Sequence, residues 1–336
     1  MNKSNLLCLL VSLVLMLGAT EMACRVLGVG DPRIAQWIVP KPRMDGEHFV
    51  GLKPNSKLVY RYPDNPRGYF DKNNEVVGRA NAFGFRGDDM RLAKSSEKTL
   101  RVAILGDSFT EGYGVKDEDT FPKKLEVILK SEGHDIEILN FGVGGLNTVQ
   151  EVDLMKGFVL KFKPDVILLM MFLNDTDRMG TVNFMSRAYY FKSLRKHSYF
   201  INGLMDSFEK KMLHHKMVEH YLDGYSKASN AWKKAKDAII DAQYAAKDHN
   251  AEFVLGLYPA LIDLDHDYPF RSIHDTVHNF SSQQQIQFVD LLKAFEGHQD
   301  KKLWVHRTDQ HPNEIAQEIA AKFLADYFKI RFLKKI

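Results

Sequence analysis

Short apolar runs, rich in branched side chains, alternate along most of the chain with segments whose apolar residues follow helical spacing. Five runs have the character of buried strands, at residues 102–105, 136–141, 165–172, 253–259 and 285–292. The third is apolar after its first residue, which is typical of a central parallel strand. Helical spacing predicts helices at residues 120–130, 148–162, 231–248 and 312–330. These repeated β-α units predict an α/β fold, a three-layer sandwich around a central parallel sheet of about five strands.

The segment before the first of these strands, residues 31–96, is rich in proline, glycine, asparagine and aromatic residues. This composition predicts loops and short strands, without a strong core of their own, that wrap the main domain. The turn at residues 81–87 packs two phenylalanines, and we interpret it as structural, with a contribution of Arg86 to the site as the alternative. We therefore expect a lead-in segment at residues 28–98, packed on a main domain at residues 99–336.

Residues 177–227 interrupt the alternation and are basic, aromatic and rich in methionine. We expect a helical insertion that overhangs the substrate site. Its histidines His214, His215 and His220 mimic a metal cluster, but adjacent side chains point to different faces of a helix. We therefore predict no metal site, and no cofactor.

The N-terminus carries an apolar run at residues 6–19, preceded by Lys3, with the length of a signal sequence. Glu21 stands at the −3 position of the nearest cleavage site and also spoils a lipobox at Cys24. A helix that continues to this point has about 20 residues, enough to span a bilayer. We predict an uncleaved signal anchor over residues 1–27, a single pass through the cytoplasmic membrane with the main domain periplasmic or extracellular. Secretion after signal cleavage is the alternative.

Charge and cysteine content restrict the partners and the covalent structure. The 46 basic and 43 acidic residues give a formal net charge of +3, spread along the chain, so no nucleic-acid partner is predicted. Cys8 and Cys24 lie in or beside the apolar N-terminal segment, which leaves the main domain without an internal disulfide. The sequence gives no indication of the oligomeric state.

Polar or glycine residues that could form a functional site follow the predicted strands or precede the final helix. The first strand ends at Gly106-Asp107-Ser108, which leaves a serine at the edge of the sheet where ligands bind in α/β folds. Gly144-Gly145 follows the second strand and Asn174 the third, while Asp309 and His311 precede the final helix. Taken singly, each residue is also explained as an ordinary turn or helix cap. Together they predict one site at this edge of the sheet.

The four blocks, in this order, resemble the SGNH (GDSL-like) hydrolase superfamily, named for a serine, a glycine, an asparagine and a histidine. The resemblance covers about residue 100 to the C-terminus, and residues 81–87 resemble the lead-in of membrane-anchored bacterial members. It implies an SGNH/flavodoxin-like fold and a cofactor-independent catalytic triad. The implied triad is Ser108 as nucleophile, His311 as base and Asp309 as acid. The implied oxyanion hole consists of the Ser108 and Gly145 N–H groups and the Asn174 side-chain amide.

Two positions depart from the family pattern. Phe172 stands where the third block usually has glycine, and Thr308 occupies the usual acid position of Asp-x-x-His. Asp309 is one residue closer to the histidine. If it does not reach the imidazole, Ser108 and His311 act as a dyad, with a backbone carbonyl orienting the ring.

The resemblance implies a serine esterase that hydrolyses an O-acyl ester, with O-acetyl as one case. The expected substrate is a small molecule, or a glycan or lipid of the cell envelope or of an exported polymer. One alternative is an O-acetyltransferase that passes the acyl group through Ser108 to an extracytoplasmic polysaccharide. A second alternative is a non-catalytic envelope-assembly protein that keeps the fold.

Overall fold

The computed structural model describes residues 2–40, 42–45, 48–176 and 192–333, so part of the expected insertion, residues 177–191, lies outside the described residues. The chain forms two compact units. The first combines Met1–Ile34 with Val182–Glu219, and the second combines Ala35–Thr181 with His220–Ile336.

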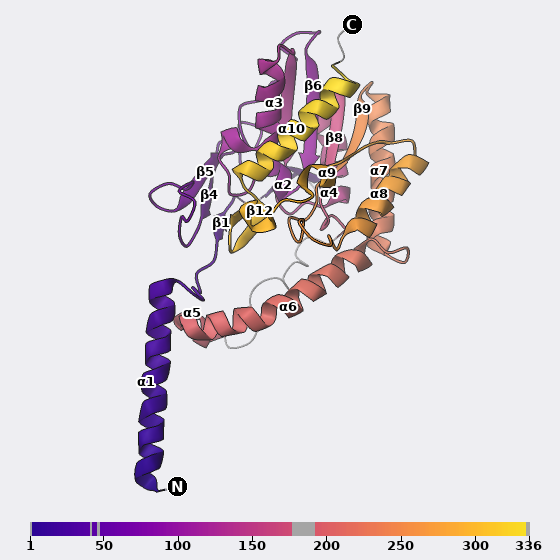
Figure 1. Ribbon diagram of the computed structural model, residues 1–336. Helices are drawn as coiled ribbons and strands as arrows, with labels where there is room; N and C mark the ends of the chain where they lie inside the picture. The colour runs from indigo at the N-terminus through magenta and orange to yellow at the C-terminus, as the bar shows by residue number, and fades with distance from the viewer. Residues whose placement is uncertain (1, 41, 46–47, 177–191, 334–336) are drawn as a thin grey trace. The chain divides into compact units, whose positions relative to one another are not determined.

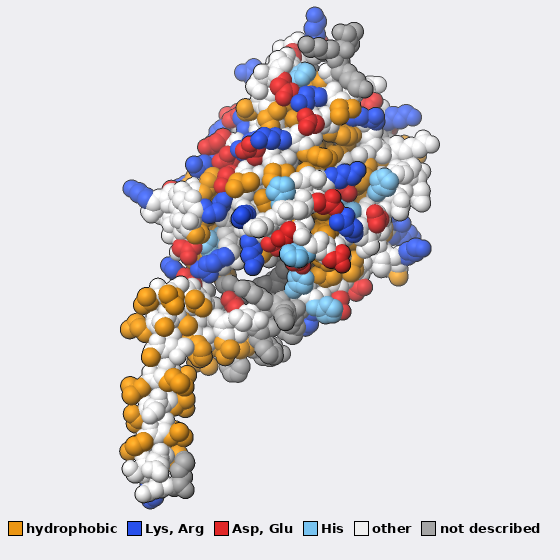
Figure 2. Space-filling view, in the orientation of Figure 1, with side chains coloured by type: hydrophobic (Ala, Val, Ile, Leu, Met, Phe, Trp, Pro, Cys, Tyr) orange, Lys and Arg blue, Asp and Glu red, His pale blue; other side chains and the backbone are white. Residues whose placement is uncertain are grey.

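The first unit is helical and contains the N-terminal apolar segment. Its helices are α1 (Lys3–Leu27), α5 (Lys192–His197) and most of α6 (Tyr199–Gly224). Within the described residues, α1 is the one helix long and apolar enough to cross a membrane, and none of its residues is buried. Figure 2 shows apolar side chains along this helix.

The end of α1 is tied to the start of α6 inside this unit. The Glu21 carboxylate accepts hydrogen bonds from the Ser198 hydroxyl at 2.8 Å and from the Tyr199 and Phe200 N–H groups at 3.1 and 2.9 Å. Arg25 forms an ion pair with Glu21 and donates to the His197 carbonyl at 2.6 Å. Because the first N–H groups of a helix have no partner within the helix, Glu21 serves as a cap for α6 supplied by α1.

The second unit contains the predicted sheet. Its strands are β6 (Leu100–Gly106), β7 (Ile136–Gly142), β8 (Val166–Met171), β9 (Glu252–Leu257) and β10 (Gln287–Asp290). They are all parallel and lie in the order β10-β9-β8-β6-β7, which confirms the predicted α/β class and strand number. Every residue of β8 is buried, as expected for a central strand. The switch in strand order falls at β6, so β6 ends where open α/β sheets place their ligands.

Helices cover both faces of this sheet (Figure 1). On one face α3 (Phe121–Ser131) packs against α10 (Glu314–Arg331), and on the other α4 (Thr148–Gly157) packs against α7 (Asn230–Asp248). The helix α8 (Arg271–Gln283) packs on β10. Short helices complete this layer arrangement: α2 (Ser108–Glu111), η1 (Asp117–Asp119), η2 (Val159–Phe162), α9 (Leu292–Phe295) and η4 (Asp300–Lys302).

Two predicted helices have other boundaries in the structure, and one helix of the structure was not predicted. The helix predicted at 148–162 divides into α4 and η2, because Phe158 leaves the helical region of backbone conformations. The final helix begins at Glu314 and not at residue 312, because Asp309–Pro312 forms strand β12, paired with β11 (Trp304–His306). Helix α8 had not been predicted, although Ile273, Val277 and Phe280 have helical spacing and are buried.

The lead-in forms its own small antiparallel sheet of β1 (Gln36–Ile38), β4 (Lys57–Arg61) and β5 (Glu75–Arg79). A separate pair consists of β2 (Pro42–Asp45) and β3 (His48–Leu52). The strands are short, as expected, but Leu58, Tyr60 and Tyr62 are almost fully buried. The aromatic residues of this segment therefore form a packed layer of the second unit.

Candidate active site

Ser108 begins α2, directly after β6. Gly106 allows this turn: its φ is +158°, and a Cβ there would lie 2.2 Å from Thr110 Oγ1 and 2.8 Å from the Met170 carbonyl oxygen. The Asp107 carboxylate caps α2 by accepting the Phe109 N–H at 2.9 Å. These contacts hold Ser108 at the carboxyl end of the sheet, where its side chain keeps some exposure to solvent.

The structure brings Ser108, His311 and Asp309 together. His311 Nε2 lies 2.9 Å from Ser108 Oγ, and His311 Nδ1 lies 2.5 Å from Asp309 Oδ1. When Nδ1–H donates to the carboxylate, Nε2 is the acceptor for the serine hydroxyl. The three side chains are therefore connected in the order of a Ser-His-Asp triad.

The short Asp-x-His spacing follows from the strand that carries it. In a β-strand, residues two apart project from the same face, so Asp309 and His311 lie side by side on β12. Thr308, at the usual acid position, bonds instead to the Ala35 N–H and the His306 ring. Asp309 thus reaches the imidazole, and orientation of the ring by a backbone carbonyl is not required.

The predicted oxyanion glycine lies in the turn after β7. Gly145 has φ +85°, and a Cβ at this position would meet no atom within 4 Å, so there is open space beside it. Its N–H has no hydrogen-bond partner in the described part of the chain. The neighbouring Gly144 N–H donates to Glu111 Oε2 at 2.6 Å, which ties this turn to α2. As the first residue of α2, Ser108 also has no acceptor for its N–H within the helix.

Asn174 follows β8 and approaches Asp107, the residue before the serine. Its side chain forms a hydrogen bond with Asp107, which partly offsets the rise in the pKa of Asp107 that burial causes, and Asn174 Oδ1 has no partner among the described residues. A primary amide has two N–H donors, so a contact with Asp107 leaves one for a ligand. Phe172, in the place of the usual glycine, is buried and stacks on Phe109 with 3.9 Å between ring centroids.

Several carboxylates surround the imidazole. Burial alone would lower the pKa of His311, but the charge and hydrogen bond of Asp309, together with the charges of Asp107 and Glu111, raise it above its ordinary value. Burial would raise the pKa of Asp309, but His311 and the hydrogen bonds to the carboxylate hold it below the usual value. Burial raises the pKa of Asp107 to about 6 and that of Glu111 to about 7. A base in this environment is suited to stabilising positive charge on the ring.

Residues of the lead-in also reach this site, which the sequence analysis missed. The Trp37 Nε1–H and the Tyr62 hydroxyl both donate to Asp309 Oδ2, at 3.1 and 3.0 Å. The Trp37 and Tyr113 rings lie 5.2 and 5.0 Å from the His311 ring, centroid to centroid. The aromatic content of the lead-in was visible in the sequence, but no motif connects it with residue 309.

Arg86 is structural, as the sequence analysis proposed. Its buried guanidinium donates to the Gly112 and Val115 carbonyl groups and to Asp117 Oδ1, and so braces the loop after α2. Other histidines have partners elsewhere: His306 binds Asp64 at 2.6 Å, and His274 binds Asp290 at 2.8 Å. Among the described residues no group of three or more acidic, histidine or cysteine side chains is arranged to hold a metal ion.

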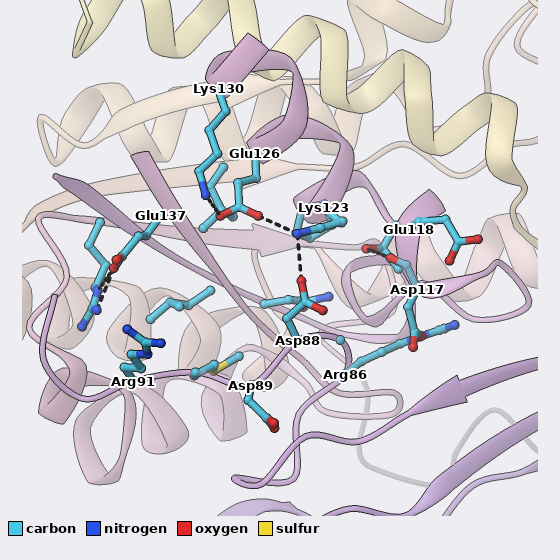
Figure 3. Close-up of a pocket in the computed structure, with 18 residues that line it drawn as sticks. Arg86, Asp88, Asp89, Arg91, Asp117, Glu118, Lys123, Glu126, Lys130 and Glu137 are labelled. Carbon is cyan, nitrogen blue, oxygen red and sulfur yellow. Dashed lines mark hydrogen bonds and ion pairs between the residues drawn. The ribbon is translucent and has the colours of Figure 1, made fainter. Parts of the chain in front are cut away.

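A pocket of about 460 Å³ lies beside α3 and β7 (Figure 3). It is lined by segments at 86–91, 117–130 and 137–140 together with Arg101, and contains none of the candidate site residues. Its charged side chains largely neutralise one another: Lys123 pairs with Asp88 and Glu126, Lys130 with Glu126, and Arg101 with Glu137. This pocket is therefore separate from Ser108, His311 and Asp309.

Three solved structures are similar in fold. A putative lipolytic protein of the G-D-S-L family from Desulfitobacterium hafniense is 12% identical, with 68% of this chain and 99% of that chain covered and a TM-score of 0.43. The esterase EstA from Pseudoalteromonas sp. is 14% identical, with 70% of this chain and 100% of that chain covered and a TM-score of 0.43. A lipase/acylhydrolase from Enterococcus faecalis is 12% identical, with 69% of this chain and 97% of that chain covered and a TM-score of 0.45. Similarity at this level concerns the fold alone.

Two comparisons of sequence are more specific. An arylesterase from Vibrio mimicus is 26% identical over 84 residues, which are 25% of this chain and 42% of that protein, so the match spans less than half of the relative. Residues 104–319, from β6 into α10, match the model of the GDSL-like lipase/acylhydrolase family. This match covers most of the chain and includes Ser108, Gly145, Asn174, Asp309 and His311. The chain belongs to the GDSL-like lipase/acylhydrolase family.

Proposed function

We propose that this protein is a serine esterase in which Ser108 attacks the carbonyl carbon of an O-acyl ester. The observation that carries the proposal is the continuous contact from Ser108 Oγ to His311 Nε2, 2.9 Å, and from His311 Nδ1 to Asp309, 2.5 Å. A serine hydroxyl is a weak nucleophile unless a base removes its proton, and His311 is in position to do so. Asp309 holds the imidazole in the required tautomer.

The reaction proceeds in two halves. The hydroxyl proton moves to His311 as Ser108 adds to the ester, and the oxyanion is received by the Ser108 and Gly145 N–H groups and the Asn174 amide. His311 then protonates the departing alcohol, which leaves an acyl-serine. Water, deprotonated by the same imidazole, releases the acid and restores the serine. Loss of one oxyanion donor in such enzymes lowers turnover by about 10²–10³.

We further propose that the substrate is an envelope or exported glycan or lipid ester on the outer side of the cytoplasmic membrane. Three observations support this. Helix α1 is long and apolar enough for an anchor. The contacts of Glu21 with the start of α6 would be lost on signal cleavage after residue 23, which favours a retained helix. The Trp37 ring, half-exposed and 5.2 Å from the His311 ring, is suited to packing against a sugar or an acyl chain.

The test uses the full chain in detergent with p-nitrophenyl acetate, butyrate and a long-chain ester, together with a fluorophosphonate label. Ser108→Ala and His311→Ala are each expected to lose about 10⁴-fold or more in kcat with the fold retained. Ser131→Ala and His249→Ala, on residues outside the site, serve as matched controls and are expected to retain activity. The fluorophosphonate is expected to label the wild type and not Ser108→Ala.

Two results would overturn the proposal. Ester cleavage at the wild-type rate by either site variant would remove Ser108 or His311 from the mechanism. A wild-type protein that is folded but neither labels nor cleaves any ester would favour the envelope-assembly alternative. Transfer of the acyl group to an added glycan in preference to water would reassign the same acyl-serine to an O-acetyltransferase.

A further inference from the structure

We propose that Trp37 and Tyr62 are positioning residues of the catalytic centre, which hold Asp309 through the carboxylate oxygen that His311 does not use. Both residues lie outside residues 104–319, the part that matches the family. The proposal rests on the function proposed above, because it assigns these residues a role in the same triad. It makes the lead-in a part of the active site.

The need for such residues follows from the position of Asp309. Its side chain is buried, and a buried carboxylate requires hydrogen-bond donors for both oxygens. Oδ1 receives His311 Nδ1–H and the His311 backbone N–H, at 2.5 and 3.2 Å. Oδ2 receives the Trp37 Nε1–H and the Tyr62 hydroxyl, at 3.1 and 3.0 Å. With both oxygens bonded, rotation of the carboxylate is restricted and Oδ1 stays directed at the imidazole.

The two donors are held by one sheet. Trp37 lies in β1 opposite Tyr60 of β4, and Tyr62 follows the end of β4. The Tyr62 N–H donates to the Asn74 carbonyl at 2.9 Å, and its ring stacks on Phe70 with 4.3 Å between centroids and 11° between planes. These contacts fix the direction of the hydroxyl. The lead-in sheet therefore presents two preformed donors to one oxygen atom.

The same segment also holds the β11-β12 hairpin, which carries Asp309 and His311. A two-stranded hairpin such as β11-β12 is marginally stable by itself. Asp64 binds His306 of β11 at 2.6 Å, and Arg67 forms two hydrogen bonds with Glu314, at 2.6 and 2.8 Å, directly after β12. The hairpin is thus attached to the lead-in at β11, at Asp309 and at the start of α10.

The contact has an electrostatic consequence that a structural role alone would not have. The groups that face His311 are Asp309 on β12, Asp107 and Glu111 around α2, and the neutral rings of Tyr113 and Trp37. The Tyr62 hydrogen bond lowers the pKa of Asp309. Without this hydrogen bond the Asp309 carboxylate is more basic. It then stabilises the protonated form of His311 more strongly. The pKa of the imidazole then rises, and the acid limb of kcat/KM moves to higher pH.

The experiment compares Tyr62→Phe, Trp37→Phe and the double variant in the full chain. Tyr62→Phe removes only the hydroxyl that donates to Asp309, whereas Trp37→Phe removes the indole N–H donor together with part of the ring that packs on His311. We expect each single variant to lose about tenfold in kcat and the double variant about 10–100-fold, with little change in KM for Tyr62→Phe, whose side chain is buried. The wild-type acid limb is expected above the ordinary pKa of histidine, and it should move to higher pH in Tyr62→Phe.

Tyr69→Phe is the matched control. Tyr69 lies in the same segment, and its hydroxyl donates to Asp119 at 2.6 Å, so this variant removes an equivalent bond that does not involve Asp309. It is expected to keep the wild-type kcat and pH profile.

Three outcomes would overturn the proposal: wild-type kcat and pH profile in Tyr62→Phe and Trp37→Phe, a loss in Tyr69→Phe equal to that in Tyr62→Phe, or a loss of kcat with an unmoved acid limb. The pH profile of Tyr62→Phe decides the question even if the double variant does not fold. If Ser108→Ala is inactive while Tyr62→Phe and Trp37→Phe behave as wild type, this proposal alone fails. If Ser108→Ala is active, the proposed function fails.

Discussion

Glu111 is a buried acid three residues after the nucleophile, and it connects α2 with the turn that carries Gly145. Its Oε2 accepts the Gly144 N–H at 2.6 Å, and its Oε1 accepts the Tyr60 hydroxyl at 3.2 Å. With the Gly144 N–H held in this way, the next peptide is fixed in orientation. Burial raises the pKa of Glu111 to about 7, so near neutral pH the side chain is partly protonated and still able to accept both bonds.

We therefore predict that Glu111→Ala lowers kcat by about tenfold or more, because the turn that directs the Gly145 N–H loses its anchor. Glu111→Gln keeps one carbonyl acceptor and is expected to lose less. Steady-state kinetics on p-nitrophenyl acetate, together with a thermal melt, separate the two effects. Equal kcat in all three proteins would show that the Gly144 contact has no bearing on turnover.

At the scale of elements, the site depends on how β12 joins α10. Asn313, fully buried, is the N-cap of α10: its Oδ1 accepts the Ile315 and Ala316 N–H groups, each at 3.0 Å. Its Nδ2 donates to the carbonyl groups of Lys302 and Trp304, at 2.7 and 3.1 Å. One side chain thus binds both the helix and the strand that pairs with β12. Displacement of this junction would move His311, two residues earlier in the chain.

Asn313→Ala is expected to lower the free energy of unfolding by about 2 kcal/mol or more, since it removes a helix cap and leaves two carbonyl groups without their donor. It is also expected to lower kcat. Ser229→Ala removes an ordinary cap, the acceptor of the Trp232 N–H on α7, and should cost about 1 kcal/mol without loss of kcat. Urea unfolding and ester hydrolysis measure the two quantities. A kcat for Asn313→Ala equal to that for Ser229→Ala would contradict the predicted link.

The elements differ in how readily the sequence reveals them, for physical reasons. The strands β6, β8 and β9 are mainly apolar runs, because both of their faces are buried. A run of this kind can be recognised from the sequence alone. The four residues of β12 carry no apolar pattern, because the strand is held by pairing with β11 and by side-chain contacts. The reach of Asp309 depended on this unforeseen strand. The contacts of Trp37 and Tyr62 with Asp309 span more than two hundred residues, and nothing in local composition encodes them.

At the scale of the whole molecule, α1 decides where the enzyme works. If the helix is retained, the protein is expected to stay with the membrane after a high-salt and carbonate wash and to be released by detergent. If the main domain is outside the cytoplasm, trypsin added to spheroplasts should degrade it, whereas a cytoplasmic marker should survive. A soluble periplasmic form whose sequence begins after residue 23 would contradict retention of α1. Protection from trypsin until the spheroplasts are lysed would contradict the orientation.

The attachment of the lead-in to the β11-β12 hairpin bears on where this enzyme can be cut or fused. Its family-matching region begins at residue 104, and a boundary chosen there keeps the nucleophile and the base. Such a fragment discards both donors to Asp309 Oδ2 and the Asp64 and Arg67 contacts with the hairpin. The shortest fragment that keeps these contacts therefore starts no later than Ala35, well before the region that matches the family.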